Sequence, residues 1–197
     1  VSSGCIKLLK SLGYSHIDYL ILTHGDFDHM GDSIYLINNY KVKNVVLNND
    51  SFNELETNLI KELKKKKIKY YQNVEKIPIS NNIITILNTE EYDNENDNSN
   101  VIYIELNNYK FMFMGDAGVD KEKDILERYN LSNIDVLKVG HHGSKTSSSK
   151  NFINKINPKY SIISVGKNNR YGHPNKEVLD TLNDSKIYRT DQDGSIM

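Results

Sequence analysis

The sequence contains a single cysteine, Cys5, which excludes an internal disulfide and a metal site built from several thiolates. No run approaches about 18 apolar residues, so we expect no transmembrane helix in this segment, and we find no signal-peptide pattern. The formal net charge is only −1, which excludes an overall positive field that would attract nucleic acid. Binding of DNA or RNA would therefore need a local basic patch.

Histidine is scarce and unevenly placed. The chain has six histidines, and residues 30 to 115 contain none. Apart from His16, they fall in three groups that each follow or border an apolar run, namely His24 with His29, His141 with His142, and His173 alone. Because each group is expected at the end of a strand, this distribution favours several loops that converge on one site.

The densest group is the segment THGDFDHMG, residues 23–31, which places two histidines and two aspartates within six positions. It directly follows the apolar run YLIL, so a buried strand would end at this cluster. A solvated polar loop is the alternative interpretation. Imidazole and carboxylate groups together are the usual nitrogen and oxygen ligands of Zn or Mn. The cluster therefore predicts a metal site, and its candidate ligands are His24, Asp26, Asp28 and His29.

Three later segments place further polar groups after predicted strands. The strand FMFM ends in a Gly-Asp pair that contains Asp116, although an aspartate there can also be a simple turn residue. The strand VLKV leads into GHHGSK, where glycines flank His141 and His142 and allow a substrate to approach closely. Lys145 follows, either as a phosphate contact or as a solvated loop lysine. A fourth segment, after ISV, contains His173.

Hydrophobic periodicity predicts alternating helices and strands along one domain, residues 1–197. We expect helices near residues 2–12, 32–39, 52–67, 121–129, 150–156 and 177–182. We expect strands near residues 17–22, 42–47, 68–71, 83–87, 101–106, 110–114, 134–139 and 160–165, and a further alternation from residue 187. Residues 88–100, rich in Asn and acidic residues, predict a loop, and residues 107–108 a hairpin turn. The lysines at 64–67 indicate a solvated helix end, with a nucleic-acid contact as the alternative. The fold class is α/β, with mixed sheets inside and helices outside.

The order of four motifs resembles the metallo-β-lactamase fold superfamily: THGDFDHMG, the strand ending in Gly-Asp, LKVGHHGSKTSS and ISVGKNNRYGHP. More narrowly, the chain is similar to the C-terminal metallo-hydrolase domain of ComEC-type DNA-internalisation competence proteins. Its closing segment, YRTDQDGSI, also resembles the end of that domain. The resemblance covers nearly the whole chain and implies an αββα sandwich with one or two divalent metal ions, Zn or Mn, at the sheet rims. Because family domains begin with a strand pair that is absent here, we expect a fragment of a longer chain with its N-terminal strands missing.

The resemblance also implies roles for the residues of the first cluster. By position, His24 and Asp26 would belong to one metal site, and Asp28 and His29 to the other. Asp28 would in addition orient the attacking water. Asp116, from the Gly-Asp motif, would be the carboxylate that bridges the two ions.

The later motifs receive roles in the same way. His141 matches the late histidine of the superfamily, and His173 is implied as a further ligand or a substrate contact. His142 is implied as a ligand, a group behind the ligands, or a proton donor, and these alternatives stay open. Lys145 would meet a phosphate as a point charge.

The chain departs from the general superfamily pattern at two places. Asp26 stands where most members have histidine, and the added carboxylate moves the metal preference from Zn toward Mn. The histidine usual between the first motif and the Gly-Asp strand is missing, and Asn98 and Ser99 lie in that region instead. We therefore expect the first metal site to be weak, or only one ion to be well held.

These features favour a metal-dependent hydrolase, specifically a phosphodiesterase or nuclease that acts on DNA during competence-related uptake. One alternative keeps the fold and changes the substrate to a lactone, thioester or β-lactam. Another is a non-catalytic DNA-binding domain of an uptake channel. If the parent protein is of the ComEC type, a membrane channel would lie upstream; otherwise the chain would be part of a soluble hydrolase.

Overall fold

The structure is a computed structural model that describes residues 2–49, 52–87 and 90–196. The chain divides into two compact units, Val1–Val74 and Glu75–Met197. Each unit has its own hydrophobic core. A single domain over residues 1–197 stays a prediction.

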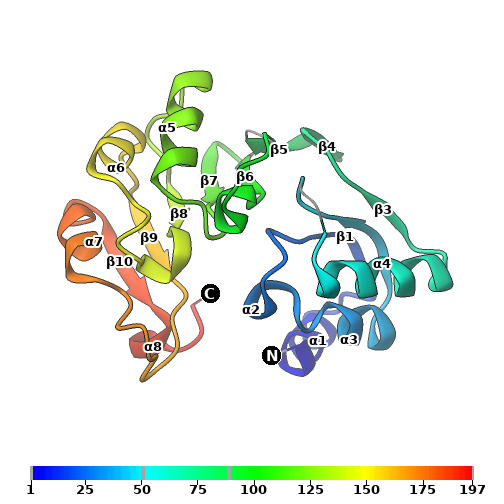
Figure 1. Ribbon diagram of the computed structural model, residues 1–197. Helices are drawn as coiled ribbons and strands as arrows, with labels where there is room; N and C mark the ends of the chain where they lie inside the picture. The colour runs from blue at the N-terminus through cyan, green and yellow to red at the C-terminus, as the bar shows by residue number, and fades with distance from the viewer. Residues whose placement is uncertain (1, 50–51, 88–89, 197) are drawn as a thin grey trace. The chain divides into compact units, whose positions relative to one another are not determined.

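Among its described residues, the first unit has a three-stranded parallel sheet with helices packed against it (Figure 1). Its strands, in sheet order, are β1 (Ile17–Ile21), β2 (Val42–Val46) and β3 (Lys69–Tyr71). Its helices are α1 (Ser2–Ser11), α2 (Phe27–Met30), α3 (Ser33–Asn39) and α4 (Glu54–Lys66). Val45 of β2 and Leu59 and Leu63 of α4 are fully buried in its core. The helical spacing of these leucines therefore explains why α4 covers the sheet.

Both ends of α4 follow from local sequence. Asn53 caps the first turn, and the Glu56 carboxylate accepts the Asn53 N–H at 2.9 Å, which completes a capping box. The helix ends at Lys67, which adopts a left-handed conformation. The three lysines of the last turn, at positions 64–66, are exposed, so the predicted solvated helix end is confirmed.

The second unit contains, within the described part of the chain, a seven-stranded mixed sheet in the order β10-β9-β8-β7-β6-β5-β4. Its strands are β4 (Lys76–Ile79), β5 (Asn82–Leu87), β6 (Val101–Leu106), β7 (Tyr109–Phe113), β8 (Val136–Lys138), β9 (Tyr160–Ile163) and β10 (Lys186–Arg189). Strands β4 to β7 pair antiparallel, whereas β7 to β10 pair parallel. The carboxyl ends of β7, β8 and β9 consequently lie side by side at one edge.

Helices pack on this sheet through a second core. They are α5 (Val119–Arg128), α6 (Lys150–Ile156), α7 (Lys176–Thr181) and the short α8 (Thr190–Asp193), and Figure 1 shows α5, α6 and α7 alongside the strands. Buried Ile125, Phe152 and Val178 bring α5, α6 and α7 into that core. Asn107 and Asn108 both have positive φ and form the predicted hairpin turn between β6 and β7.

The structure adds several elements that the sequence did not predict. Strand β4 was not expected, nor were the short helix α2 and the 3₁₀ turns η1 (Glu95–Asn98) and η2 (Gly140–Gly143). Residues 88–89 of the predicted loop lie outside the described residues, but residues 97–100 are buried rather than solvated. The reason is that β6 runs antiparallel to β7, so the segment before β6 lies at the edge where β7 ends. Over the described ranges, no helix has the length and apolar character needed to cross a membrane.

Candidate metal centre

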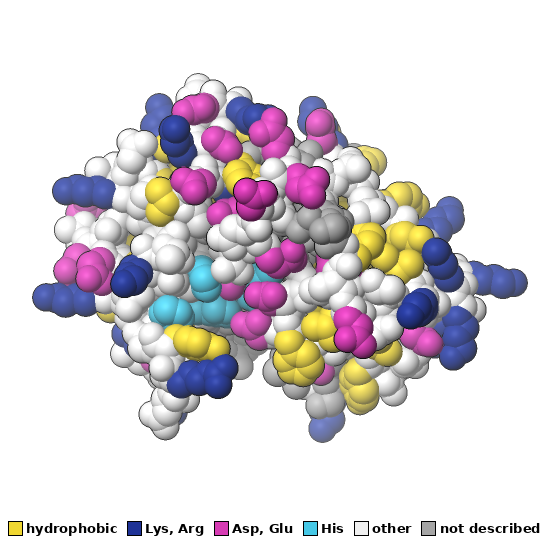
Figure 2. Space-filling view, viewed as in Figure 1, with side chains coloured by type: hydrophobic (Ala, Val, Ile, Leu, Met, Phe, Trp, Pro, Cys, Tyr) yellow, Lys and Arg dark blue, Asp and Glu magenta, His cyan; other side chains and the backbone are white. Residues whose placement is uncertain are grey.

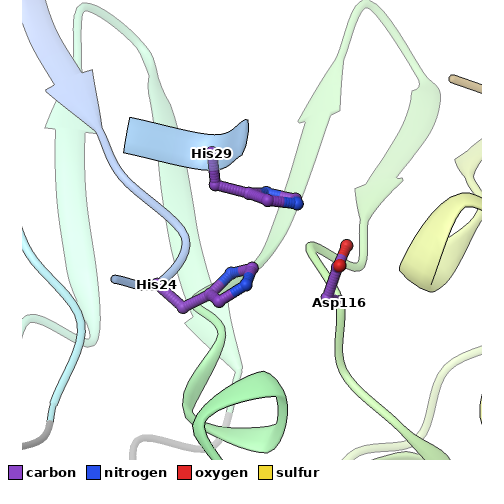
Figure 3. Close-up of side chains that lie close together, drawn as sticks. All are labelled: His24, His29 and Asp116. Carbon is purple, nitrogen blue, oxygen red and sulfur yellow. The ribbon is translucent and has the colours of Figure 1, made fainter. Parts of the chain in front are cut away.

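In the first unit, the predicted ligand cluster follows β1 and continues into α2. The rings of His24 and His29 lie with their centroids 4.2 Å apart, and Figure 3 shows both projecting from this part of the chain. The Thr23 hydroxyl oxygen lies 3.1 Å from Nδ1 of His24 and 3.1 Å from Nδ1 of His29. The Thr23 hydroxyl therefore contacts both rings, in each case at Nδ1.

The opposite nitrogens of these rings lie beside carboxylates. Nε2 of His24 is 3.6 Å from Oδ2 of Asp26, and Nε2 of His29 is 3.7 Å from Oδ2 of Asp28. His24 is buried, whereas the side chains of both aspartates are exposed. Sequence reasoning expected these four residues to share one chemistry, and the first unit brings them together as two imidazole–carboxylate pairs.

Close packing positions this cluster against the start of α4. The Asn53 side chain donates a 2.8 Å hydrogen bond to the carbonyl of Gly25. A Cβ atom at Gly25 would meet Asn53 Nδ2 and would lie 2.7 Å from Glu56 Oε2. Glycine between the first histidine and the first aspartate is therefore required by space, because the capping box of α4 occupies the position that a side chain would need.

In the second unit, the ends of three adjacent parallel strands carry the remaining candidates. Asp116 follows β7, His141 and His142 follow β8, and the loop with His173 follows β9. Figure 3 shows the Asp116 carboxylate on the turn after its strand. Convergence of the later loops, which the sequence predicted from strand ends, is thus confirmed within this unit.

The histidine pair repeats the arrangement of the first unit. Nε2 of His141 and Nε2 of His142 lie 3.8 Å and 3.7 Å from the same oxygen, Oδ2 of Asp116. Nδ1 of His141 is 3.1 Å from the Thr146 hydroxyl. Nδ1 of His142 is 2.7 Å from the carbonyl oxygen of Ser164, which can only accept, so Nδ1 carries the proton in the neutral ring. The tautomer of His142 therefore presents Nε2 as a lone-pair donor, which favours the ligand role among its three alternatives.

The buried polar segment before β6 holds the turn that carries Asp116. The Ser99 hydroxyl accepts the Asp116 N–H at 3.0 Å, and the Asp97 carboxylate accepts the Gly118 N–H at 2.6 Å. On α5, the Lys121 ammonium donates to the Ser99 carbonyl at 2.8 Å. Burial lowers the pKa of Lys121 to about 8, against the opposing effect of Asp97. This segment, which replaces the missing middle histidine in chain order, therefore supports the candidate bridging carboxylate.

His173 lies beside His141, one of the candidate ligands of the second unit. Its ring centroid is 6.0 Å from that of His141, and the exposed Tyr171 ring stacks against it at 5.8 Å. The Asn169 amide accepts the His173 N–H at 2.9 Å and donates to the His173 carbonyl at 2.7 Å. Burial lowers the pKa of His173, and the neighbouring His141 acts in the same direction. A neutral imidazole is the form that binds a metal ion.

Lys145 lies in the loop that follows the histidine pair. Its backbone N–H donates to the Asn175 side chain at 2.8 Å, and the residue itself is exposed. The loop is also tied to α5, because the Glu122 carboxylate accepts the N–H groups of Ser148 and Ser149. Lys145 therefore has a fixed backbone and a solvent-accessible charge, which suits contact with an anion.

Comparison with known proteins identifies the family of the chain. The sequence model of the metallo-β-lactamase superfamily matches residues 6–167 of the chain. The chain belongs to the metallo-β-lactamase superfamily. The predicted fold and the predicted resemblance to ComEC-type proteins are both confirmed. At the level of the superfamily, the chain groups with metal-dependent hydrolases.

Two curated relatives match nearly the whole chain. ComE operon protein 3 of Bacillus subtilis (strain 168) is 34% identical over 198 residues, which cover 97% of this chain and 26% of that protein. Competence protein ComA of Neisseria gonorrhoeae is 27% identical over 98% of this chain and 27% of its own length. The chain thus spans about a quarter of these relatives.

A solved structure confirms the fold independently. It is assigned as a metal-dependent hydrolase of Parabacteroides distasonis ATCC 8503, and it matches with a TM-score of 0.57 and 16% identity. The match covers 90% of this chain and 78% of that one. At this identity the likeness establishes the superfamily fold alone.

The donor chemistry fits the divalent metal ions that the superfamily uses. Two ligands of one Zn ion, each about 2.1 Å from it, lie roughly 3.4 Å apart. The imidazole–carboxylate separations within the two units, 3.6–3.8 Å, are close to this value. Sequence reasoning did not assign Thr23, Thr146 or Asn169 a role in holding the histidines. The signal available in the sequence was the position of each threonine, since Thr23 directly precedes His24 and Thr146 follows the His141–His142 pair closely.

Proposed function

We propose that this chain is a metal-dependent phosphodiesterase domain that acts on DNA during competence-related DNA uptake. The observation that carries the proposal is the repeated imidazole–carboxylate pair, in which Nδ1 is held by the protein and Nε2 lies 3.6–3.8 Å from an aspartate oxygen. Superfamily membership and the similarity to competence proteins support it.

The proposed ligands of one or two Zn or Mn ions are His24, Asp26, Asp28, His29, Asp116, His141, His142 and His173. Bound ions would lower the pKa of water and offset negative charge on phosphoryl oxygens. The carboxylates Asp26 and Asp28 add oxygen ligands, which favours Mn over Zn. Asp116 is proposed to bridge the ions because it is buried and faces two imidazoles within its own unit.

The chain's own residues supply orientation and charge. Thr23, Thr146 and the Ser164 carbonyl hold Nδ1 of the imidazoles, so each Nε2 keeps its direction. Asp28 is proposed to orient the attacking water, since its exposed carboxylate adjoins His29. Lys145 is proposed to contact a phosphoryl oxygen, because its ammonium is exposed on a loop whose backbone is fixed.

Hydrolysis of bis-p-nitrophenyl phosphate and of single-stranded DNA tests this proposal. The full-length protein would be assayed with added Mn or Zn, beside the variants Asp116→Asn and His16→Ala. We expect metal-dependent turnover that Asp116→Asn abolishes and that His16→Ala retains, since His16 lies outside the three histidine groups. Absence of turnover with either metal would overturn the proposal, and turnover of lactone or thioester substrates alone would replace it.

A further inference from the structure

The loop between β9 and α7 carries a short ladder of aromatic rings. The Tyr171 ring stacks on His173 with centroids 5.8 Å apart and planes inclined by only 18°. The His173 ring meets the His141 ring at 6.0 Å with an edge contact. His141 in turn lies beside Asp116. The ladder therefore runs from an exposed tyrosine to the candidate ligands of the second unit.

Tyr171 is largely exposed, although it contacts His173 and Arg170. Its residue surface is 65% exposed, so most of the ring is open to solvent although His173 lies against one side. The Arg170 guanidinium donates to the Tyr171 hydroxyl at 2.7 Å and lies 4.9 Å from the ring centroid. The guanidinium thus lies over the ring and also contacts its hydroxyl, and an exposed ring with a cation beside it is suited to bind a base together with the adjacent phosphate.

The loop presents these groups in a defined conformation. Asn169 bridges both backbone groups of His173, with hydrogen bonds of 2.9 Å and 2.7 Å. On the other side, Gly143 packs so closely on Pro174 that a Cβ atom there would lie 2.6 Å from the proline Cβ. A ring that is already held in place loses little conformational entropy when it binds a ligand.

Exposed basic residues lie on the two loops that carry the rings of the ladder. Lys167 and Arg170 are exposed on the same loop. Lys145 is exposed on the neighbouring loop, which the Asn175 side chain ties to this one. Figure 2 shows histidine side chains at the surface with a hydrophobic and a basic side chain beside them. These residues supply positive charge on the two loops, which a chain of net charge −1 needs in order to bind a polyanion.

We propose that Tyr171 is a stacking platform for one base of single-stranded DNA, and that Arg170 contacts the adjacent phosphate. The inference rests on the proposed function and narrows its substrate class, from DNA in general to a base-bearing single strand. In a duplex the bases are already stacked on their neighbours, whereas a single strand offers the face of a base to a protein ring. A simple phosphodiester or an abasic strand lacks that face.

Fluorescence anisotropy of labelled oligonucleotides tests the platform without catalysis. The full-length protein would be titrated, in EDTA, against a 12-nucleotide oligothymidylate and against an abasic strand of the same length. We expect Tyr171→Ala to weaken oligothymidylate binding about 5- to 100-fold and to leave abasic binding nearly unchanged. Tyr171→Phe keeps the ring and should retain affinity. Arg170→Ala should lower the slope of log K against log salt by about 0.7, as expected for one lost phosphate contact.

Tyr109→Ala is the matched control. Tyr109 is also exposed, but it lies at the start of β7, whereas Asp116 follows the end of that strand. Equal oligothymidylate affinity for wild type and Tyr171→Ala would overturn the inference, as would equal losses in Tyr109→Ala and Tyr171→Ala. Base-dependent binding that needs Tyr171, in a protein that hydrolyses neither bis-p-nitrophenyl phosphate nor DNA, would support the platform and overturn the catalytic proposal.

Discussion

The ammonium group of Lys121 donates a 2.8 Å hydrogen bond to the backbone carbonyl of Ser99, and both residues are buried. Ser99 in turn accepts the N–H of Asp116 through its hydroxyl. A lysine on α5 is therefore linked through one residue to the proposed bridging carboxylate. The same buried contacts therefore link α5 to the backbone that positions Asp116.

The stability of the protein should depend on pH through Lys121. Burial lowers the pKa of Lys121 from 10.5 to about 8, so between these values the unfolded chain binds more protons than the folded one. Stability relative to a variant without this group therefore rises as pH increases through that window. We expect the free energy of unfolding of wild type minus that of Lys121→Met to be larger at pH 10 than at pH 7.5, measured by urea denaturation.

Lys123→Met is the control for this experiment, because Lys123 is exposed on the same helix. Its difference from wild type should not change with pH over that range. A constant difference for Lys121→Met would contradict the prediction.

Removal of the Thr23 hydroxyl should weaken metal binding. One hydroxyl oxygen lies 3.1 Å from Nδ1 of both His24 and His29, so its loss releases two rings at once. Loss of a group that orients metal ligands typically costs 10- to 100-fold in affinity, and we expect Thr23→Val to fall in about that range. Competition with a chromophoric chelator measures the affinity. Thr23→Ser should retain it, and an unchanged affinity in Thr23→Val would exclude this role.

Gly25→Ala should distort the first cluster. The new Cβ would meet the Asn53 side chain and the Glu56 carboxylate, which form the capping box of α4. Overpacking of this kind costs about 1–3 kcal/mol, and we expect a lower melting temperature with weaker metal binding. Gly4→Ala is the matched control, because no atom lies within 4 Å of a Cβ there. Equal melting temperatures for the two variants would show that the cluster tolerates the methyl group.

Metal should stabilise the folded protein. A ligand that binds only the folded state at 100 times its dissociation constant adds about 2.7 kcal/mol. We expect Mn or Zn to raise the melting temperature of wild type in differential scanning fluorimetry, and EDTA to reverse the shift. His141→Ala should reduce the shift and His16→Ala should not. A shift of equal size in both variants would place the ions elsewhere.

Local patterns predicted most of the elements. The apolar run before the first cluster belongs to β1, and residues 150–156 form α6 with the predicted bounds. Strand β4 escaped prediction because it is a short edge strand that contains Pro78, which the pattern of a central strand would exclude. Helix α2 escaped because its four residues are too few for a helical period.

The polar segment before β6 was predicted as a loop, and its burial was not predicted. Asp97, Asn98 and Ser99 are residue types that are usually solvated, and nothing local marks them as buried. Their burial follows from the antiparallel pairing of β6 with β7, which places them against the turn of Asp116. Pairing between strands is a property of the whole sheet.

The residue types and their order were sufficient to establish the superfamily and the donor chemistry, because imidazole and carboxylate groups after apolar runs are local features of the chain. Only the tertiary structure shows that Nδ1 of each histidine in the two histidine pairs contacts a protein partner, whereas Nε2 lies beside a carboxylate. That arrangement depends on Thr23 beside two rings, on the Ser164 carbonyl beside His142, and on contacts between loops that only the packed sheet brings together.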